Sequence, residues 1–495
     1  MIENNILISK YFEENSLVKA DIDSFNYFIE HGMKDIVDEV GDIIPTIIPP
    51  EFEDFRIKFD KIEIEKPVLT EADGSKRDIF PTEARLRKLS YSAPITLNVS
   101  IIIDGTQRDS FRTQVGKLPI MVKSKHCHLN GLNKEQLIEK GEDPDDPGGY
   151  FILNGNERVL ITVEDLAANK MFFERKKIGP IKYIGQIFSE RGAYKIPHQI
   201  YQMKDGVLYL DFTRFKRIPI IALVKALGLV KDDEIMKMIS SGEQHDDVII
   251  NLYQSVDLKK QDDALEFIGK KMGINQPRDI TLERTLENLD RYLFPHLGII
   301  PEKRMEKAYN LCKLMNRFLV IISKDIVIDK DHYANKRLKL SGDLLMDLFR
   351  VNLRALVNDM LYNYQRLVKR GKFTSVKNII RDKLLTSRIK SALATGMWVG
   401  GRKGISQNID RANFLASLSH LQRVNSLLSA SQENFEARAL HSTHWGRLCP
   451  IETPEGTSIG LRKNLALLSL TTQGAFSEDK LKKSLTGLGL KVQNE

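Results

Sequence analysis

Histidine and glutamate side chains gather in one segment near the C-terminal end of the sequence. The run HSTHWGRLCPIETPEGTSIGL covers residues 441–461 and holds His441, His444, Glu452 and Glu455. Imidazole and carboxylate groups at this density could bind zinc or act as an acid/base pair. The same run contains two prolines and three glycines, which favour a stiff, tightly turned loop whose polar groups bond to the backbone. We interpret the segment as such a loop, and an independent hydrolase is the alternative.

Glycines and cations lie close together just upstream, in GMWVGGRKGIS at residues 396–406. Glycines let a backbone approach a phosphate or a base closely, and Arg402 and Lys403 supply positive charge. We name these two side chains as candidates for binding a nucleic-acid backbone. A flexible basic loop without a ligand is the alternative.

Two other places hold residue types that bind metals. His126, Cys127 and His128 are consecutive, and three consecutive side chains cannot easily surround one ion. Asp329 and Asp331 have lysines and an arginine close by in the sequence, so we expect a salt-linked joint between domains there. The sequence contains no phosphate-binding loop, no dinucleotide-binding glycine motif, no H-E-x-x-H and no D-x-D-x-D cluster for two Mg²⁺ ions.

Composition limits the class of protein further. The 495 residues are too many for one hydrophobic core and predict about two to four domains. Lysine and arginine outnumber aspartate and glutamate by 74 to 66, and the resulting charge of +8 favours a polyanionic partner. Three cysteines without a C-x-x-C pair argue against a disulfide scaffold. No apolar run reaches the ~18 residues typical of a membrane span, and no secretory signal begins the chain, so we expect a cytoplasmic protein.

Periodicity predicts an α+β fold of several domains, with mixed sheets flanked by helices. Residues 1–50 have apolar positions at helical spacing, and from Phe55 the spacing changes to two. Asp104-Gly105 predicts a hairpin turn, and so does Lys204-Asp205-Gly206 between HQIYQM and VLYLDF. Helices are predicted from Pro219 to about residue 325, over 341–371, and over about 375–395 with a basic face.

Longer motifs resemble a known family, the second-largest subunit of multisubunit RNA polymerases. The resemblance spans nearly the whole chain. It is carried by LVKADIDSFNYFI from Leu17, FPTEARLRKLSYSAP from Phe80, LPIMVKSKHCHL from Leu118, GGYFILNGNERVLI from Gly148, DKDHYANKRLKLSGDLLMDLFR from Asp329, and the 441–461 segment. Eukaryotic and archaeal forms look closer than bacterial ones, and the chain resembles the N-terminal half that is a separate polypeptide in some archaea.

The resemblance implies a division into domains and a role. The protrusion is expected at 1–178 and 334–394, an inserted lobe at 179–333, the fork at 395–472 and the start of the external region at 473–495. Such a subunit forms one wall of the DNA cleft of DNA-directed RNA polymerase and contacts downstream DNA and the RNA–DNA hybrid. We expect the isolated chain to be inactive, and a free-standing nucleic-acid-binding accessory protein is the alternative function.

Within the expected fork, QNIDRANFLASLSHLQR resembles the region that lines the hybrid. By this resemblance Gln407, Asp410, His420 and Arg423 are nucleic-acid-binding candidates, with Gln407 and Arg423 contacting the transcript. The following LLSASQEN, at 427–434, departs from the bacterial pattern, so we expect insensitivity to rifamycins.

The resemblance also implies which ligands and partners to expect. We expect no cofactor on this chain and the catalytic Mg²⁺ on the largest subunit. Expected partners are the C-terminal half of the second-largest subunit, largest-subunit polypeptides, smaller polymerase subunits, the DNA template, the RNA transcript and general transcription factors.

Overall fold

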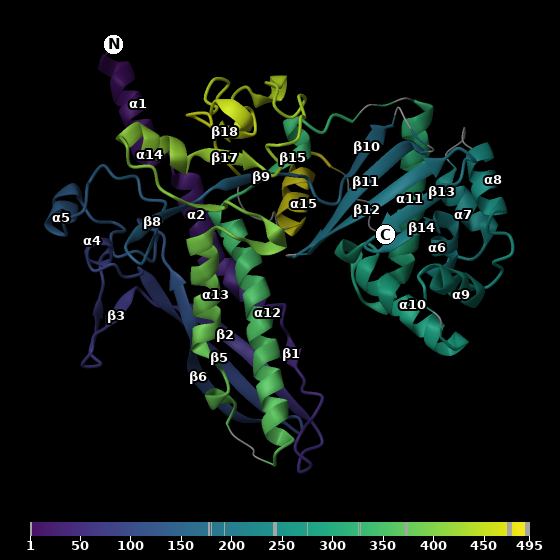
Figure 1. Ribbon diagram of the computed structural model, residues 1–495, viewed down its shortest axis with the longest axis horizontal. Helices are drawn as coiled ribbons and strands as arrows, with labels where there is room; N and C mark the ends of the chain where they lie inside the picture. Colours follow the sequence, from purple (N-terminus) through teal and green to yellow (C-terminus); the bar gives the residue numbers. More distant parts are fainter. Residues whose placement is uncertain are drawn as a thin grey trace. The chain divides into compact units, whose positions relative to one another are not determined.

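Two compact units make up the chain in the computed structural model. Unit 1 contains Met1–Asp165 and Leu338–Glu495, and unit 2 contains Leu166–Arg337. The structure describes residues 2–176, 179, 181–192, 194–240, 245–274, 276–324, 326, 328–371, 375–472 and 478–490. Unit 2 is therefore an insertion in the sequence of unit 1 (Figure 1).

The names protrusion, lobe and fork stay predictions. The expected end of the first protrusion segment, residue 178, lies outside the described residues, as do 473–477 and 491–495 of the expected external region.

Unit 1 begins with helices, as the apolar spacing predicts. Its helices are α1 (Ile2–Glu14), α2 (Lys19–Tyr27), which continues through a π-helical turn (Phe28–Gly32) into α3 (Met33–Asp38), then α4 (Pro81–Leu86), α5 (Lys134–Glu139), α12 (Ser341–Val368), α13 (Asp382–Thr395), α14 (Phe414–Leu421) and α15 (Glu478–Gly487). The long helix predicted over 341–371 is confirmed by α12, whose inward stripe includes Leu345, Phe349 and Met360.

Open sheets provide the rest of unit 1. The largest has the order β1-β2-β5-β6, and it is built from β1 (Asp42–Ile43), β2 (Phe55–Ile64), β5 (Ser92–Ile103) and β6 (Thr106–Pro119). β5 and β6 pair antiparallel around Asp104 and Gly105, both at positive φ, which confirms the predicted hairpin. The small strands β3 (Val68–Thr70) and β4 (Lys76–Asp78) form a separate ribbon.

The N-terminus of α12 is fixed against α2. The backbone N–H of Ser341 donates to Asp21 Oδ1 at 3.2 Å, and the backbone N–H of Gly342 donates to Ser24 Oγ at 3.1 Å. A Cβ at Gly342 would lie 2.0 Å from the carbonyl oxygen of Ser24, so only glycine allows this approach. Burial raises the pKa of Asp21 to about 6, against the effect of its hydrogen bonds with Ser341.

The second predicted helix is shorter than expected. Residues Val376–Asn378 form a single 3₁₀ turn, and α13 begins only at Asp382. Arg381 before it is extended, and its Nε donates to Asp359 on α12 at 2.8 Å. α13 then runs beside α12 and packs on β6 (Figure 1).

Unit 2 contains one antiparallel five-stranded sheet in sequence order. Its strands are β10 (Met171–Arg175), β11 (Ile181–Arg191), β12 (Tyr194–Met203), β13 (Leu208–Phe212) and β14 (Phe215–Pro219). β12 and β13 pair around the predicted turn at Lys204-Asp205-Gly206, which confirms the second hairpin.

Helices follow the sheet of unit 2, as predicted after Pro219. They are α6 (Ile220–Ala226), α7 (Asp232–Ile239), α8 (His245–Tyr253), α9 (Gln261–Lys271), α10 (Arg278–Tyr292) and α11 (Arg304–Ser323). One apolar core joins sheet and helices, and Phe318 of α11 meets Phe173 of β10 edge to face, with ring centroids 5.3 Å apart. Asp331 pairs with Lys336 at 3.1 Å, as expected for charges close in the sequence. Lys330 instead pairs with the distant Glu174, at 3.3 Å.

The α+β class with several domains is confirmed. Among the described residues, no helix is long and apolar enough to cross a membrane.

Candidate nucleic-acid interface

The segment after α13 adds strands to two sheets that begin in the first half of the chain. β16 (Ser406–Asn408) pairs antiparallel with β8 (Asn156–Leu160), which also pairs with β7 (Phe151–Leu153). β17 (Arg423–Ser426) lies parallel to β9 (Thr162–Leu166) and antiparallel to β18 (Arg462–Asn464). β15 (Lys336–Lys339) completes this mixed sheet, in the order β15-β9-β17-β18.

Three of the predicted site residues bond to one another. The backbone N–H of Asp410 donates to His420 Nδ1 at 3.0 Å, and His420 Nε2 lies 3.1 Å from Gln407 Oε1. Since Nδ1 accepts, Nε2 carries the proton and donates to Gln407, whose own Nε2 donates to the carbonyl oxygen of Gly404 at 2.9 Å. The group therefore fixes the last turn of α14 to β16 and to the segment between them.

This arrangement requires a neutral imidazole. Burial, and then the positive charge of Arg423, lower the pKa of His420 to about 4. His420 is buried, so it acts as a positioning residue for Gln407 rather than as a surface contact. Asp410 is exposed, and its Oδ1 accepts from the backbone N–H of Ala412 at 3.0 Å.

Arg423 differs from Arg402 because no carboxylate among the described residues forms an ion pair with it, and Asp410 and Glu452 act on it only through longer-range attraction. It begins β17 and is half-buried, and Arg462 lies on the adjacent strand β18. Burial and the charge of Arg462 lower the pKa of Arg423. Within the described part of the chain, neither guanidinium has a carboxylate at ion-pair distance. Two arginines on neighbouring strands therefore leave positive charge available for a phosphate or another anion.

The two loop cations have different surroundings. Arg402 Nη2 donates to Asp165 at 3.2 Å, and both side chains are largely buried, so this cation is already neutralised within unit 1. Lys403 is exposed on the loop between Gly401 and Gly404. Of the two, the structure leaves Lys403 more accessible to a polyanion.

The loop that follows β17 is fixed by Arg438. Its Nη1 donates to the carbonyl oxygens of Thr457 and Ile459, at 2.7 and 3.0 Å, and its Nη2 donates to that of Ala430 at 2.9 Å. Gly460 lies against the Arg438 backbone, where a Cβ would be 2.3 Å from the carbonyl oxygen.

His441 bonds within the 441–461 segment, whereas Glu452 bonds to α14. His441 Nδ1 accepts from the backbone N–H of Thr443 at 3.1 Å, and Glu452 accepts from Ser419 Oγ at 2.5 Å. Over the described ranges, no three histidine, cysteine or acidic side chains are grouped so that they could hold a metal ion. The contacts agree with a structural loop.

One residue of this region was missed by sequence reasoning. Arg411 pairs with Glu157 at 2.7 Å and Asp146 at 3.1 Å, and its guanidinium lies 4.9 Å from the ring centroid of Tyr150. Arg85 pairs with the same Glu157 at 2.7 Å. The partners lie about 250 or more positions earlier, so a motif centred on Arg411 contains no signal of them.

Large apolar side chains are exposed throughout this part of unit 1. They include Phe414, Leu415, Leu427, Phe435, Leu440, Trp445, Ile451, Ile459, Leu467, Leu468 and Leu470, with Phe435 and Ile451 exposed by 88% and 84%. Single exposed apolar residues are common, but such a concentration is typical of a surface that another chain covers.

Comparison with known proteins identifies the family. Residues 16–387 match the family model described as RNA polymerase beta subunit, and residues 407–470 match RNA polymerase Rpb2, domain 3. The chain is 41% identical to subunit Rpo2N of DNA-directed RNA polymerase from Methanocaldococcus jannaschii, over 98% of this chain and 99% of that relative. Rpo2N from Halobacterium salinarum is also 41% identical, over 98% of this chain and 95% of the relative.

A longer relative shows which part of the subunit this is. Subunit Rpo2 from Saccharolobus solfataricus is 41% identical over 98% of this chain, but the chain spans only 43% of that relative. The family matches cover the N-terminal domains, and the Rpo2N relatives have the same extent. The chain therefore belongs to the family of second-largest RNA polymerase subunits and corresponds to the N-terminal half.

Proposed function

We propose that this chain forms one wall of the DNA cleft in a DNA-directed RNA polymerase and contacts downstream DNA and the RNA–DNA hybrid. The observation that carries the proposal is the Arg423–Arg462 pair of cations, which lies in the segment matched by Rpb2 domain 3. Guanidinium groups that lack an ion-pair partner can bind phosphates without selecting sequence. Lys403 adds an exposed cation on the preceding loop.

Gln407, Asp410 and His420 have a positioning role in this proposal. Their mutual hydrogen bonds hold the turn between β16 and α14 and fix the Gln407 amide. Arg402 contributes through its ion pair with Asp165 rather than through a phosphate.

The assembled enzyme would supply what this chain lacks. The C-terminal half of the subunit would cover exposed apolar residues of the 414–470 segment, and largest-subunit polypeptides would hold the catalytic Mg²⁺. Smaller subunits and general transcription factors complete the proposed set of partners. In this division the lobe, 179–333, falls within the inserted unit 2. The protrusion is 1–178 with 334–394, the fork is 395–472, and 473–495 begin the external region. The exposed apolar side chains count against a free-standing accessory protein.

An elongation assay tests the role of Arg423. In a polymerase assembled with the partner subunits, Arg423→Ala should leave assembly intact and weaken retention of the transcript. The logarithm of affinity should fall less steeply with the logarithm of salt, by about one unit of slope, if one phosphate contact is lost. Arg108→Ala is the matched control, because Arg108 is an exposed arginine of unit 1 on β6.

Two results would contradict the proposal. Elongation by the Arg423→Ala enzyme that equals that of the control at raised salt would remove Arg423 from the interface. Template-directed RNA synthesis by the purified chain alone would show that the active centre does not belong to other polypeptides.

A further inference from the structure

A basic pocket lies on unit 2, between the β13–β14 turn and the connection from α9 to α10. Its volume is about 540 Å³, and residues of the turn, of the connection and of both helices line it. Arg214 comes from the turn, Lys271 ends α9, and Arg284 lies on α10. The pocket is far along the sequence from the candidate nucleic-acid interface, and it shares no residue with that interface.

Three cations line the pocket, and no acidic residue is among its described lining. The Arg214 guanidinium lies over the ring of Phe215 at 5.3 Å, and the Lys271 ammonium lies over the ring of Phe267 at 5.3 Å. These ring contacts position the two charged groups without neutralising them. Arg284 is exposed on its helix. The side chains thus bring positive charge together at one concave place, which favours an anion.

The same pocket offers apolar surface. Met272 and Ile274 are half-buried and line it beside the cations. Phe215 also lines it, but this side chain is only 4% exposed, so its ring face cannot stack on a nucleotide base. A bare phosphate would leave the apolar part of the pocket unused.

We propose that this pocket binds an acidic peptide segment of a partner protein, with an apolar side chain between its carboxylates. The carboxylates would pair with Arg214, Lys271 and Arg284, and the apolar side chain would cover Met272 and Ile274. Charge complementarity selects the acidic partner, and the apolar lining favours a peptide over a nucleic-acid backbone.

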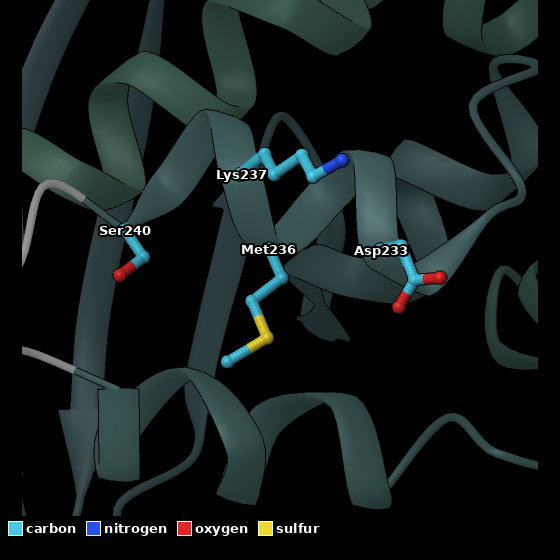
Figure 2. Close-up of a pocket in the computed structure, with 4 residues that line it drawn as sticks. All are labelled: Asp233, Met236, Lys237 and Ser240. Atoms are coloured by element: carbon cyan, nitrogen blue, oxygen red, sulfur yellow. The ribbon is translucent and has the colours of Figure 1, made fainter.

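A second pocket on unit 2 shows the contrast. Asp233, Met236, Lys237 and Ser240 line it, all on or directly after α7 (Figure 2). Its volume is about 470 Å³, similar to the first, but its two charges have opposite signs. It therefore has no comparable preference for an anion, and Lys237 provides a control position.

A binding experiment on the full chain tests the proposal. The probe is a short fluorescent peptide in which glutamate and leucine alternate. Its binding is measured by fluorescence anisotropy at low salt. Comparison probes are the same peptide with glutamine for glutamate and a duplex DNA. Arg284→Glu reverses one charge in the pocket, and Lys237→Glu makes the same change of charge at the other pocket. Circular dichroism verifies that both variants fold, with Arg284→Gln as the milder replacement.

We expect the acidic peptide to bind and the glutamine peptide not to bind. Arg284→Glu should weaken binding about three- to tenfold, as expected for loss of an exposed ion pair together with new repulsion, and Lys237→Glu should leave it unchanged. Three outcomes would overturn the proposal: no binding of the acidic peptide, equal weakening in both variants, or binding of duplex DNA alone that is sensitive to Arg284→Glu. The last would assign the pocket to nucleic acid.

Discussion

The buried ion pair between Lys463 and Glu164 gives the sharpest prediction for the stability of unit 1. Lys463 Nζ lies 3.1 and 3.0 Å from the two carboxylate oxygens of Glu164, and the side chains are 9% and 3% exposed. Lys463 is on β18 and Glu164 on β9, and β17 lies between them in the sheet. The pair thus connects positions 299 residues apart in sequence.

Lys463→Met removes the ammonium and keeps most of the volume of the side chain. Breaking a buried pair on one side costs about 3–5 kcal/mol, because the remaining charge stays away from water. Replacing both partners by apolar residues, in Glu164→Leu with Lys463→Met, should restore most of this loss, since neither charge is then desolvated. At a urea slope of about 3 kcal/mol/M, the single replacement should lower the unfolding midpoint by about 1–1.7 M.

Tryptophan fluorescence can follow unit 1 alone. The chain has two tryptophans, Trp398 and Trp445, and both belong to unit 1. Trp398 is buried, and its Nε1 donates to the carbonyl oxygen of Leu344 at 2.8 Å, whereas Trp445 is 63% exposed. In a Trp445→Phe background, urea unfolding followed through Trp398 therefore reports on the unit that contains the ion pair.

Arg462→Met is the matched control, because it removes an exposed cation from the same strand. It should shift the midpoint by much less than Lys463→Met. A loss below about 1 kcal/mol for Lys463→Met would show that the pair is not desolvated as the structure has it. A double replacement as unstable as the single one would show that packing, rather than charge burial, sets the cost.

The remaining predictions concern pH and backbone. The pKa of His420 is 6.5 in the unfolded chain and about 4 in the folded one, so between these pH values only the unfolded state binds the proton. The stability present above pH 6.5 is therefore lost as pH falls toward 4, by at most about 3 kcal/mol. The urea midpoint of His420→Asn should fall less over this pH range. The pKa of Asp21 is raised from 3.8 to about 6, so the folded state loses stability as pH rises through this range and the carboxyl ionises. In urea unfolding, the change in stability caused by Asp21→Asn should therefore be more favourable at pH 7 than near pH 4. Gly460→Ala, at φ +71° and against Arg438, should lower the free energy of unfolding by more than about 2 kcal/mol. Gly456→Ala, at φ +79° with open space around it, should show only the smaller effect of backbone strain. Equal losses in the two variants would contradict the clash with Arg438.

The two hairpins and α12 could be predicted from the sequence, because neighbouring residues determine where they form. Both hairpins form at turns in which glycine occupies a position of positive φ, Gly105 and Gly206. α12 follows a clear stripe of apolar residues, and its start is fixed by Asp343, whose carboxylate accepts from the backbone N–H of Leu340 at 3.1 Å. The predicted start of α13 was wrong, because residues 376–378 form a separate 3₁₀ turn and Arg381 bonds to α12.

Contacts between distant parts of the chain were beyond those signals. The parallel pairing of β17 with β9 joins residues about 260 positions apart, and no periodicity specifies a partner at that distance. The ion pairs of Arg402 with Asp165 and of Arg411 with Glu157 arise from the same long-range arrangement. For this reason the sequence suggested Arg402 as a phosphate contact, although its charge is already neutralised inside unit 1.

The adjacency of β15 and β9 in one sheet has a consequence for how this subunit can change in evolution. The chain leaves unit 1 after Asp165, at the end of β9, and returns through β15. Because exit and return are neighbouring strands, the residues between them can grow, shrink or be exchanged while the host sheet keeps its register. Changes in the length or sequence of unit 2 should therefore disturb the core of unit 1 less than changes elsewhere in the chain.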